Sequence, residues 1–361
     1  MGQIMEEKPY LIVGQGLAGS LLGYELLKAC KKVLLVDPNE ANTSSKVAAG
    51  LYNPITGKKM QKTWLADTLF PFLEHYYSEV EQTLGIRALF PMGIYRPFLS
   101  LEEQNDWMGR SAETSYQAYL KEVSTHSADI PQLKDPLGGL HLQKAGYVHL
   151  PRLLAAFRHY FLERNSLETG HFQEESLHTA QGIQYKNQDF EALIYCNGTA
   201  AQSHPLWHWL PFRPVKGEVL EAKATQTLPY VINRGVFILP TEEQTWRIGA
   251  TYQWKDLNDR PTEAAKEELL QKMQEIWTGE IQIINHRAGV RPATVDRRPI
   301  LGKHPERTGV YLFNGLGTKG VSLAPYFANQ MAQHLLIGTQ IPHEVSIERF
   351  FSLYFPSKAS L

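Results

Sequence analysis

The segment "YLIVGQGLAGSLLGYELL" at residues 10–27 decides the fold. Gly14 permits a tight turn, Gly16 lets the backbone approach a pyrophosphate, and Gly19 lets a helix pack closely on the preceding strand. Asp37 ends the next apolar run, 18 positions after Gly19 (37 − 19 = 18), where an acid accepts the ribose hydroxyls of an adenosine. The segment therefore predicts a dinucleotide-binding strand–helix–strand unit, without separating NAD from FAD.

Length and composition bound the number of domains and the class of partner. The 361 residues predict about two domains, because single hydrophobic cores stop growing near ~250–300 residues. A net charge of −1 without a basic stripe argues against nucleic acid. The absence of an apolar leader or a spanning apolar run predicts no membrane contact and a cytoplasmic location. Cys30 and Cys196 lack metal-ligand spacing, so we expect neither a metal nor a disulfide.

The order of expected elements predicts an α/β protein, α+β overall, made of two interleaved units. The strand–helix pattern returns at 139–165, with Pro151 at the first helical position, whereas residues 215–290 alternate as antiparallel strands. Further helices are expected at 63–84, 262–278 and 323–336. We expect a Rossmann-like doubly wound cofactor-binding domain, interleaved with a mainly antiparallel β-sheet substrate domain. The cofactor domain covers 1–85, 141–212 and 288–361, and the substrate domain covers 86–140 and 213–287.

A second glycine loop, "GLGTKG" at 315–320, repeats the written pattern of the first. A second adenosine site would need an acid about 20 residues later, but no acid occurs before Glu344, and Pro325 enters the helix early. Two interpretations remain open. The glycines either serve only to begin a helix, or they leave backbone amides bare for a partly negative group, such as the pyrimidine end of a flavin.

Arg291, in "AGVRPATVDRRPILG" at 288–302, is a candidate anion ligand. The following proline holds the arginine extended, and a guanidinium grips a carboxylate with two parallel hydrogen bonds. A structural salt bridge is the alternative interpretation.

The ordered motifs resemble the FAD-dependent D-amino-acid oxidase family, in its glycine oxidase and sarcosine oxidase branch. The resemblance rests on "GQGLAG" with Asp37, "SSKVAAGLYNP", "AGYVHLPRLLAAF", "VKGEVL", "GVFILP" with "RIGATY", "GVRPATVDRRPILG" and "GLGTKGVSLAPYFA", which span nearly the whole chain. It implies that the cofactor domain binds FAD non-covalently. The cofactor residues that it implies are Gly14, Gly16, Gly19 and Asp37 at the ADP half, Ser44 and Ser45 at the pyrophosphate, Ala48, Ala49 and Gly50 beside the ring, Gly198 after a late strand, and Gly315, Gly317, Thr318, Lys319 and Gly320 at the pyrimidine end.

The same resemblance implies three catalytic residues. Arg291 grips the substrate carboxylate beside the flavin, and Tyr252 lines the same pocket. Lys319 is either an electrostatic aid to oxygen reduction or a surface lysine. Phe237 stands where glycine oxidase has a tyrosine that bonds the carboxylate, so one hydrogen bond to a charged group, worth about 1.5–3 kcal/mol, is missing. His149 lies near relevant motifs, but we expect a structural or solvated role for it and for His286.

The resemblance implies an FAD-dependent oxidase or dehydrogenase. Its substrate would be a primary or secondary amine bearing a carboxylate, its product an imine, and its electron acceptor oxygen or another molecule. One alternative is a flavin domain that acts on a carboxymethyl-amine of modified tRNA. Another is an electron-relay flavoprotein without an amine substrate of its own.

Overall fold

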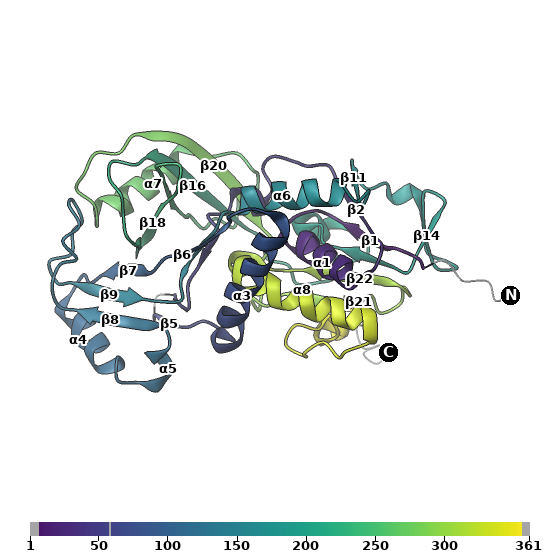
Figure 1. The fold of residues 1–361 in the computed structure, drawn as a ribbon, viewed down its shortest axis with the longest axis horizontal. Helices are drawn as coiled ribbons and strands as arrows, with labels where there is room; N and C mark the ends of the chain where they lie inside the picture. The colour runs from purple at the N-terminus through teal and green to yellow at the C-terminus, as the bar shows by residue number, and fades with distance from the viewer. Residues whose placement is uncertain (1–6, 58, 356–361) are drawn as a thin grey trace, which may run out of the picture.

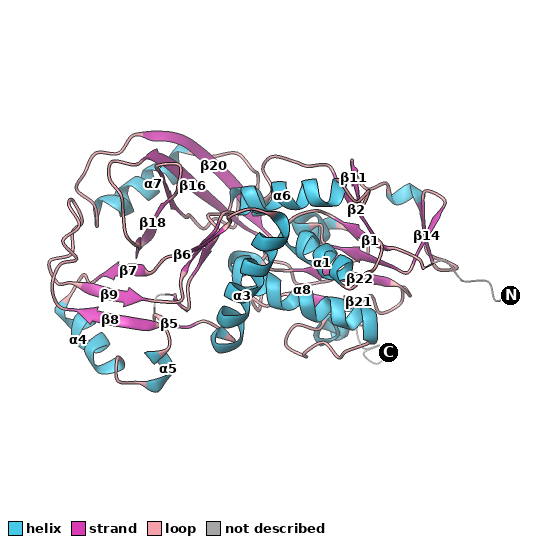
Figure 2. Cartoon of the chain, in the orientation of Figure 1, coloured by secondary structure: helices cyan, strands magenta, loops and turns pink. Residues whose placement is uncertain are grey.

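The computed structural model describes residues 7–57 and 59–355, which form two lobes side by side (Figure 1). One lobe is built on a six-stranded sheet and the other on an eight-stranded sheet. Figure 2 shows that helices flank the first sheet while the second lobe is mostly strand. The mixture of helices and sheets confirms the predicted fold class.

The six-stranded sheet has the order β11-β2-β1-β15-β22-β21. Its first five strands run parallel, and β21 pairs antiparallel to β22. The central strands β1, β15 and β22 are mostly buried apolar runs, as expected for a parallel sheet covered on both faces. The strands of the sheet are β1 (Tyr10–Val13), β2 (Val33–Asp37), β11 (Leu167–Thr169), β15 (Ala192–Tyr195), β21 (Ile300–Lys303) and β22 (Val310–Asn314).

Long helices of this lobe share one hydrophobic core with the six-stranded sheet (Figure 1). They are α1 (Leu17–Lys28), α3 (Ala66–Leu84), α6 (Leu150–Leu162) and α8 (Gly320–Ile337). The opposite sheet face packs a second core around Trp207, beside the small sheet of β12 (Leu177–His178), β13 (Ile183–Tyr185) and β14 (Gln188–Phe190). The sheet edge at the carboxyl ends of the parallel strands is thus left for loops.

The eight-stranded sheet has the order β20-β16-β19-β18-β17-β7-β9-β8. All its described pairings are antiparallel except that of β17 with β7. Its strands are β7 (Ile94–Pro97), β8 (Leu120–Ser124), β9 (Gly139–Leu142), β16 (Val215–Lys223), β17 (Val231–Arg234), β18 (Val236–Pro240), β19 (Thr245–Gly249) and β20 (Ile283–Arg291). Helix α7 (Glu263–Gln274) buries Leu269 and Met273 in a core with Trp246.

Short elements connect and flank the two lobes. A three-stranded sheet and a two-stranded hairpin lie among them. They are β3 (Leu51–Tyr52), β4 (Ile55–Thr56), β5 (Gln61–Lys62), β6 (Leu89–Pro91), β10 (Gly146–Val148), α2 (Ser44–Val47), α4 (Leu101–Arg110), α5 (Thr114–Gln117), α9 (Phe351–Tyr354) and the 3-10 turns η1 (Glu174–Ser176), η2 (Gly198–Ser203), η3 (Gly317–Lys319) and η4 (Ile347–Phe350).

Helix boundaries differ from the sequence predictions for local reasons. Pro151 is the second helical residue and not the first, because His149 caps α6 by accepting the N–H of Arg152 on Nδ1. Helix α7 begins after Thr262, whose side chain caps it, and ends earlier than predicted. Helix α8 begins three residues earlier than predicted, at Gly320. Gly85 ends α3 in the left-handed conformation, with φ 64°, as expected for a glycine stop.

The division into two interleaved domains stays a prediction, and the sheets suggest how to refine it. The expected boundary between residues 140 and 141 lies inside β9, and that between 287 and 288 lies inside β20. We propose that both strands belong whole to the substrate domain. No helix in the described part of the chain is long and apolar enough to span a bilayer.

Candidate active site

Four loops meet where the parallel strands β1, β2, β15 and β22 end, the edge at which open α/β sheets bind ligands. In the first loop Gly14 has φ 101°, and a Cβ there would lie 2.7 Å from the carbonyl oxygen of Cys196. A Cβ at Gly19 would lie 1.9 Å from the carbonyl oxygen of Gly14. The positive φ at Gly14 agrees with the predicted tight turn, and the small space at Gly19 agrees with the predicted close packing of the helix.

The amino end of α1 faces the hydroxyl of Ser45. The Leu17 N–H donates to Ser45 Oγ at 3.2 Å, and a Cβ at Gly16 would lie 3.3 Å from the same oxygen. Ser44 is the first residue of α2, which packs on β20 so closely that a Cβ at Gly289 would lie 3.0 Å from Val47 Cβ. The two serines thus lie at a helix N-terminus, the arrangement that suits a phosphate.

Asp37 at the end of β2 organises the first loop. One carboxylate oxygen accepts the Gln15 N–H at 2.8 Å, and the other accepts the Asn39 N–H at 2.7 Å. The Arg158 guanidinium lies 3.7 Å away. The acid therefore fixes the loop and keeps lone pairs for a further donor.

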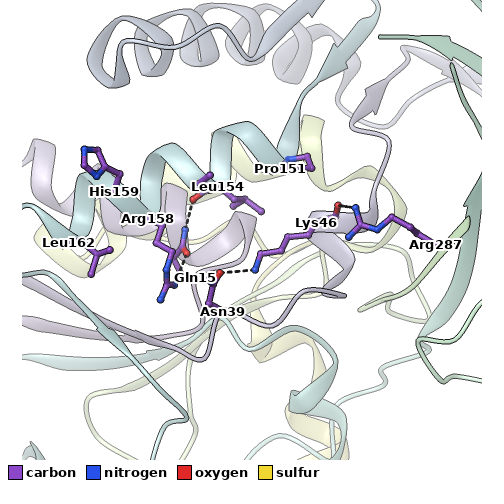
Figure 3. A pocket seen from close by; sticks show the side chains of 10 residues that line it. Gln15, Asn39, Lys46, Pro151, Leu154, Arg158, His159, Leu162 and Arg287 are labelled. Carbon is purple, nitrogen blue, oxygen red and sulfur yellow. Dashed lines mark hydrogen bonds between the residues drawn. The ribbon is translucent and has the colours of Figure 1, made fainter. Parts of the chain in front are cut away.

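A cavity of about 380 Å³ adjoins this acid (Figure 3). Apolar residues of α6 form one wall, and Lys46, Arg158 and Arg287 add three cationic side chains. Lys46 donates from Nζ to Asn39 Oδ1 at 2.8 Å, and burial lowers its pKa. Sequence reasoning missed these cations, because they converge from segments far apart along the chain.

Residues 48–50 follow α2 and lie against β10. Gly50 has φ 78°, and a Cβ there would lie 1.9 Å from the Val148 carbonyl oxygen. The Val148 N–H donates to the Gly50 carbonyl oxygen at 3.0 Å, and Ala49 is buried. Ala48 follows α2 as its C-cap. The segment from Ala48 to Gly50 is thus fixed against the start of α6.

Asn314 links the last two strand ends. Its Nδ2 donates to the Gly198 carbonyl oxygen at 2.9 Å, and its Oδ1 accepts the Gly315 N–H at 2.8 Å. Gly198 and Gly315 have φ values of 56° and 75°, which favour glycine. The sequence analysis missed Asn314, although a polar residue directly after a buried strand was a usable signal.

Lys319 lies at the second glycine loop and is half-buried. Its Nζ donates to Thr56 Oγ1 at 3.1 Å and to Thr63 Oγ1 at 3.4 Å. Burial lowers its pKa, and the nearby Arg298 and Arg297 lower it further. The interpretation of Lys319 as a surface lysine is therefore wrong.

The second loop is joined to the strand that carries Arg291. The Gly317 N–H donates to the Pro292 carbonyl oxygen at 3.2 Å, and a Cβ at Gly315 would lie 2.8 Å from Thr294 Cγ2. Thr318 is exposed, and Gly320 is the first residue of α8. The structure thus brings the second loop next to Arg291.

Arg291 is a half-buried cation at the end of β20. A Cβ at Gly217 on the paired strand β16 would lie 2.0 Å from Arg291 Nη2, so the guanidinium occupies the place of a side chain at 217. Nη1 lies 3.4 Å from the Thr251 carbonyl oxygen, and Cζ lies 5.0 Å from the Tyr252 ring centroid. Sequence reasoning quoted Gly217 but gave it no role.

The described residues offer Arg291 no acidic partner. Burial lowers the pKa of its guanidinium, and Tyr252 supplies the single opposing contribution. The interpretation of Arg291 as half of a structural salt bridge is therefore wrong for residues 7–57 and 59–355. A half-buried, unpaired cation is costly unless an anion joins it, so this position suits a carboxylate.

Phe237 and two histidines complete the candidate residues. Phe237 pairs with Gly249 across β18 and β19, and a Cβ at Gly249 would lie 2.9 Å from its ring. His149 caps α6, and His286 lies 2.9 Å from Glu218. Burial lowers the pKa of both histidines. The described residues contain no cluster of three or more His, Cys, Asp or Glu that could hold a metal ion.

Comparisons with known proteins agree with this geometry. A family model described as "FAD dependent oxidoreductase" matches residues 10–334. The tRNA 5-methylaminomethyl-2-thiouridine biosynthesis bifunctional protein MnmC of Marinobacter nauticus is 24% identical over 95% of this chain, which spans only 58% of that protein. Glycine oxidase of Pseudomonas aeruginosa is 26% identical over 87% of this chain and 91% of its own. The iminodiacetate oxidase structure from Chelativorans sp. BNC1 has a TM-score of 0.78, with 22% identity over 93% of this chain and 97% of that one.

Proposed function

The chain belongs to the family of FAD dependent oxidoreductases, and on that premise we propose that it oxidises the C–N bond of a primary or secondary amine that bears a carboxylate. It is an FAD-dependent enzyme close to glycine oxidase and to amino-acid oxidases. The observation that carries the proposal is Arg291, a half-buried guanidinium without an acidic partner among the described residues, seated over Gly217.

The residues at the sheet edge fit FAD. Bare backbone at Gly14 and Gly19 and the helix N-terminus facing Ser45 leave room and donors for a pyrophosphate. We propose that FAD is held by Gly14, Gly16, Gly19, Asp37, Ser44, Ser45, Ala48, Ala49, Gly50, Gly198, Gly315, Gly317, Thr318, Lys319 and Gly320, with Arg291 beside the ring. Binding is non-covalent in this proposal, since Cys196 is buried behind the first loop and Cys30 lies beyond α1.

The protein's part in the reaction is to bind and orient. Bound FAD supplies an acceptor for the hydride that leaves the carbon next to the neutral amine. Arg291 fixes the substrate carboxylate in two parallel hydrogen bonds, which sets the direction of the neighbouring C–H bond. Phe237 contributes an apolar wall, and Lys319 places positive charge beside the second loop. The imine leaves for hydrolysis in water, and the electrons pass to oxygen or another acceptor.

Arg291 is the residue with which to test this function. Arg291→Ala is expected to lose about 2 kcal/mol of transition-state binding, or roughly 30-fold in kcat/KM, because a charged hydrogen-bond partner is removed. Arg291→Lys keeps the charge but cannot form two parallel hydrogen bonds to a carboxylate, so an intermediate loss of kcat/KM is expected. The measurement is anaerobic fading of the flavin absorbance with glycine, sarcosine and iminodiacetate. Unchanged kinetics in Arg291→Ala would contradict the proposal.

A second candidate is a carboxymethyl-amine carried on tRNA. The 24% identity with the tRNA-modifying relative favours it, although the chain spans only 58% of that protein. The net charge of −1 opposes it, because phosphate contacts need a basic surface. Salt-sensitive retention of tRNA in a filter-binding assay would support this candidate. Stoichiometric flavin fading by any amine would remove the remaining alternative, an electron relay without a substrate of its own.

A further inference from the structure

Two exposed aromatic side chains lie on the loop beside the unpaired guanidinium, where Tyr252 contacts Arg291 and Trp254 lies next to Tyr252. Tyr252 is 55% exposed and Trp254 is 51% exposed. Their ring centroids lie 6.4 Å apart with planes tilted by 31°. Of the seven tryptophans, all within the described residues, Trp254 is the one that is exposed. Large aromatic side chains left in water beside a cation mark a binding surface.

The loop that carries this aromatic pair is fastened to β16 by buried charges. Lys216 is 1% exposed, and its Nζ donates to Asn258 Oδ1 at 3.0 Å and to the Arg260 carbonyl oxygen at 2.6 Å. The Glu218 carboxylate accepts the Thr262 N–H at 2.8 Å and its hydroxyl at 3.0 Å. Buried charges are retained only where such bonds compensate them, so the path of the loop is specified.

Strand β16 therefore positions both the Arg291 guanidinium and the loop with the two aromatic side chains. Side chains alternate across a strand, so Gly217 faces Arg291 while Lys216 and Glu218 lie on the opposite face. Gln253, between the two aromatics, exchanges two backbone hydrogen bonds with Lys216, at 2.9 and 3.0 Å. The aromatic pair is thus held in register with the guanidinium.

We propose that Tyr252 and Trp254 bind a flat aromatic or heteroaromatic ring attached to the amine nitrogen of a carboxymethylamine substrate. The inference rests on the proposed function and narrows its substrate class. With the carboxylate on Arg291, the ring lies against an aromatic surface that begins 5.0 Å from the guanidinium carbon. Ring pairs attract at centroid separations of about 4.5–7 Å, and each pair strengthens binding by roughly 2- to 13-fold. Because Phe237 has no hydroxyl to bind the carboxylate, a contact with the aromatic ring would supply part of the missing affinity.

The test separates ring binding from turnover by using ethers. In (benzyloxy)acetate and methoxyacetate an oxygen replaces the amine, so neither compound can form an imine. Binding to the flavin-loaded enzyme is followed by the change in flavin absorbance. We expect (benzyloxy)acetate to bind at least 5-fold more tightly than methoxyacetate, and Trp254→Ala to remove about 5-fold of its affinity while sparing methoxyacetate. Trp254→Phe keeps an aromatic face and is expected to retain most of the preference.

Each result supports or overturns the inference. Equal affinity for the two ethers in the unmodified enzyme overturns it, and so does a Trp254→Ala variant that binds (benzyloxy)acetate normally. If Arg291→Ala weakens both ethers while Trp254→Ala weakens neither, the carboxylate site stands and only the aromatic site is lost. If Arg291→Ala weakens neither ether, the proposed function fails, and the aromatic assignment fails with it.

Discussion

The two glycine loops have the same sequence pattern, GxGxxG, but glycine is required for different structural reasons in each. In the first loop, Cβ atoms at Gly14 and Gly19 would meet backbone oxygens at 2.7 and 1.9 Å. In the second, Cβ atoms at Gly317 and Gly320 would have no neighbour closer than 3.5 Å. The first loop requires glycine because two backbone segments touch. The second requires it for left-handed φ angles at Gly315 and Gly317 and for space at Gly315, where a Cβ would meet the Thr294 methyl group at 2.8 Å.

The loops also differ in charge. Asp37 beside the first loop has Arg158 as a neighbour at 3.7 Å, and Lys46 and Arg287 line the adjoining cavity. Lys319 in the second loop has hydroxyl partners, and the charged neighbours that shift its pKa are arginines. An end that holds both an acid and several cations suits a cofactor half with hydroxyl and phosphate groups. A cationic end suits a ring that gains negative charge during the reaction.

The largest expected effect comes from the third glycine of each loop. Gly19→Ala should lower the free energy of unfolding by at least about 3 kcal/mol, because a backbone oxygen cannot move aside for the methyl group. Gly320→Ala, at a helical position where the new methyl group would make only ordinary van der Waals contacts, should raise it by about 0.5–1 kcal/mol. Urea unfolding of both variants measures the contrast, and equal stability of the two would break the comparison.

The acids beside the loops give the next effect. Asp37→Asn should weaken FAD binding about 10-fold, because the ribose hydroxyls lose a charged acceptor. Asp296 is the matched control, since it also accepts a nearby backbone N–H, that of Arg298, and pairs with an arginine. Asp296→Asn should leave FAD affinity unchanged. Flavin fluorescence on dilution measures both affinities, and a similar loss in the two variants would contradict the assignment of the adenosine end.

The smallest effect tests the cation of the second loop. The pKa of Lys319 is lowered in the folded protein, so the unfolded chain binds more protons between that folded pKa and the ordinary value near 10.5. In this window the free energy of unfolding should rise with pH. Lys319→Met removes this contribution to the slope. Urea unfolding in steps from pH 8 to pH 10.5 gives the free energy of unfolding of the unmodified protein and of Lys319→Met. The same pH dependence in both would contradict a lowered pKa for Lys319.

Local patterns carried most of what could be predicted from the sequence. The strand, glycine loop and helix at residues 10–28 depend on neighbours in the chain, as does the acid at Asp37. The antiparallel strands 236–240 and 245–249, around a polar turn, were equally local. The Arg-Pro pattern singled out Arg291, and the family resemblance suggested its role. The family match over residues 10–334 confirms the resemblance itself.

Contacts between distant segments could not be predicted. Gly217 faces Arg291 only because β16 and β20 pair in one particular register. Lys216 holds the loop that carries Trp254, and this contact depends on where the irregular loop returns to β16. Periodicity gives the face of a side chain within its own strand but not the residue opposite it. The start of α6 differed by one residue because His149 caps the helix, which places Pro151 at the second helical position.

The Arg291 guanidinium fills the volume that a side chain at position 217 would occupy, so a larger residue at 217 could replace it. Side chains at 217 and 291, on neighbouring strands, can each fill this volume, so a larger residue at one position can compensate for a smaller residue at the other. Gly217→Val combined with Arg291→Ala would return an apolar side chain to the space and remove the cation, with little change in packing. A redesign of this kind would replace the proposed carboxylate site with an uncharged one through two substitutions, leaving the cofactor loops untouched.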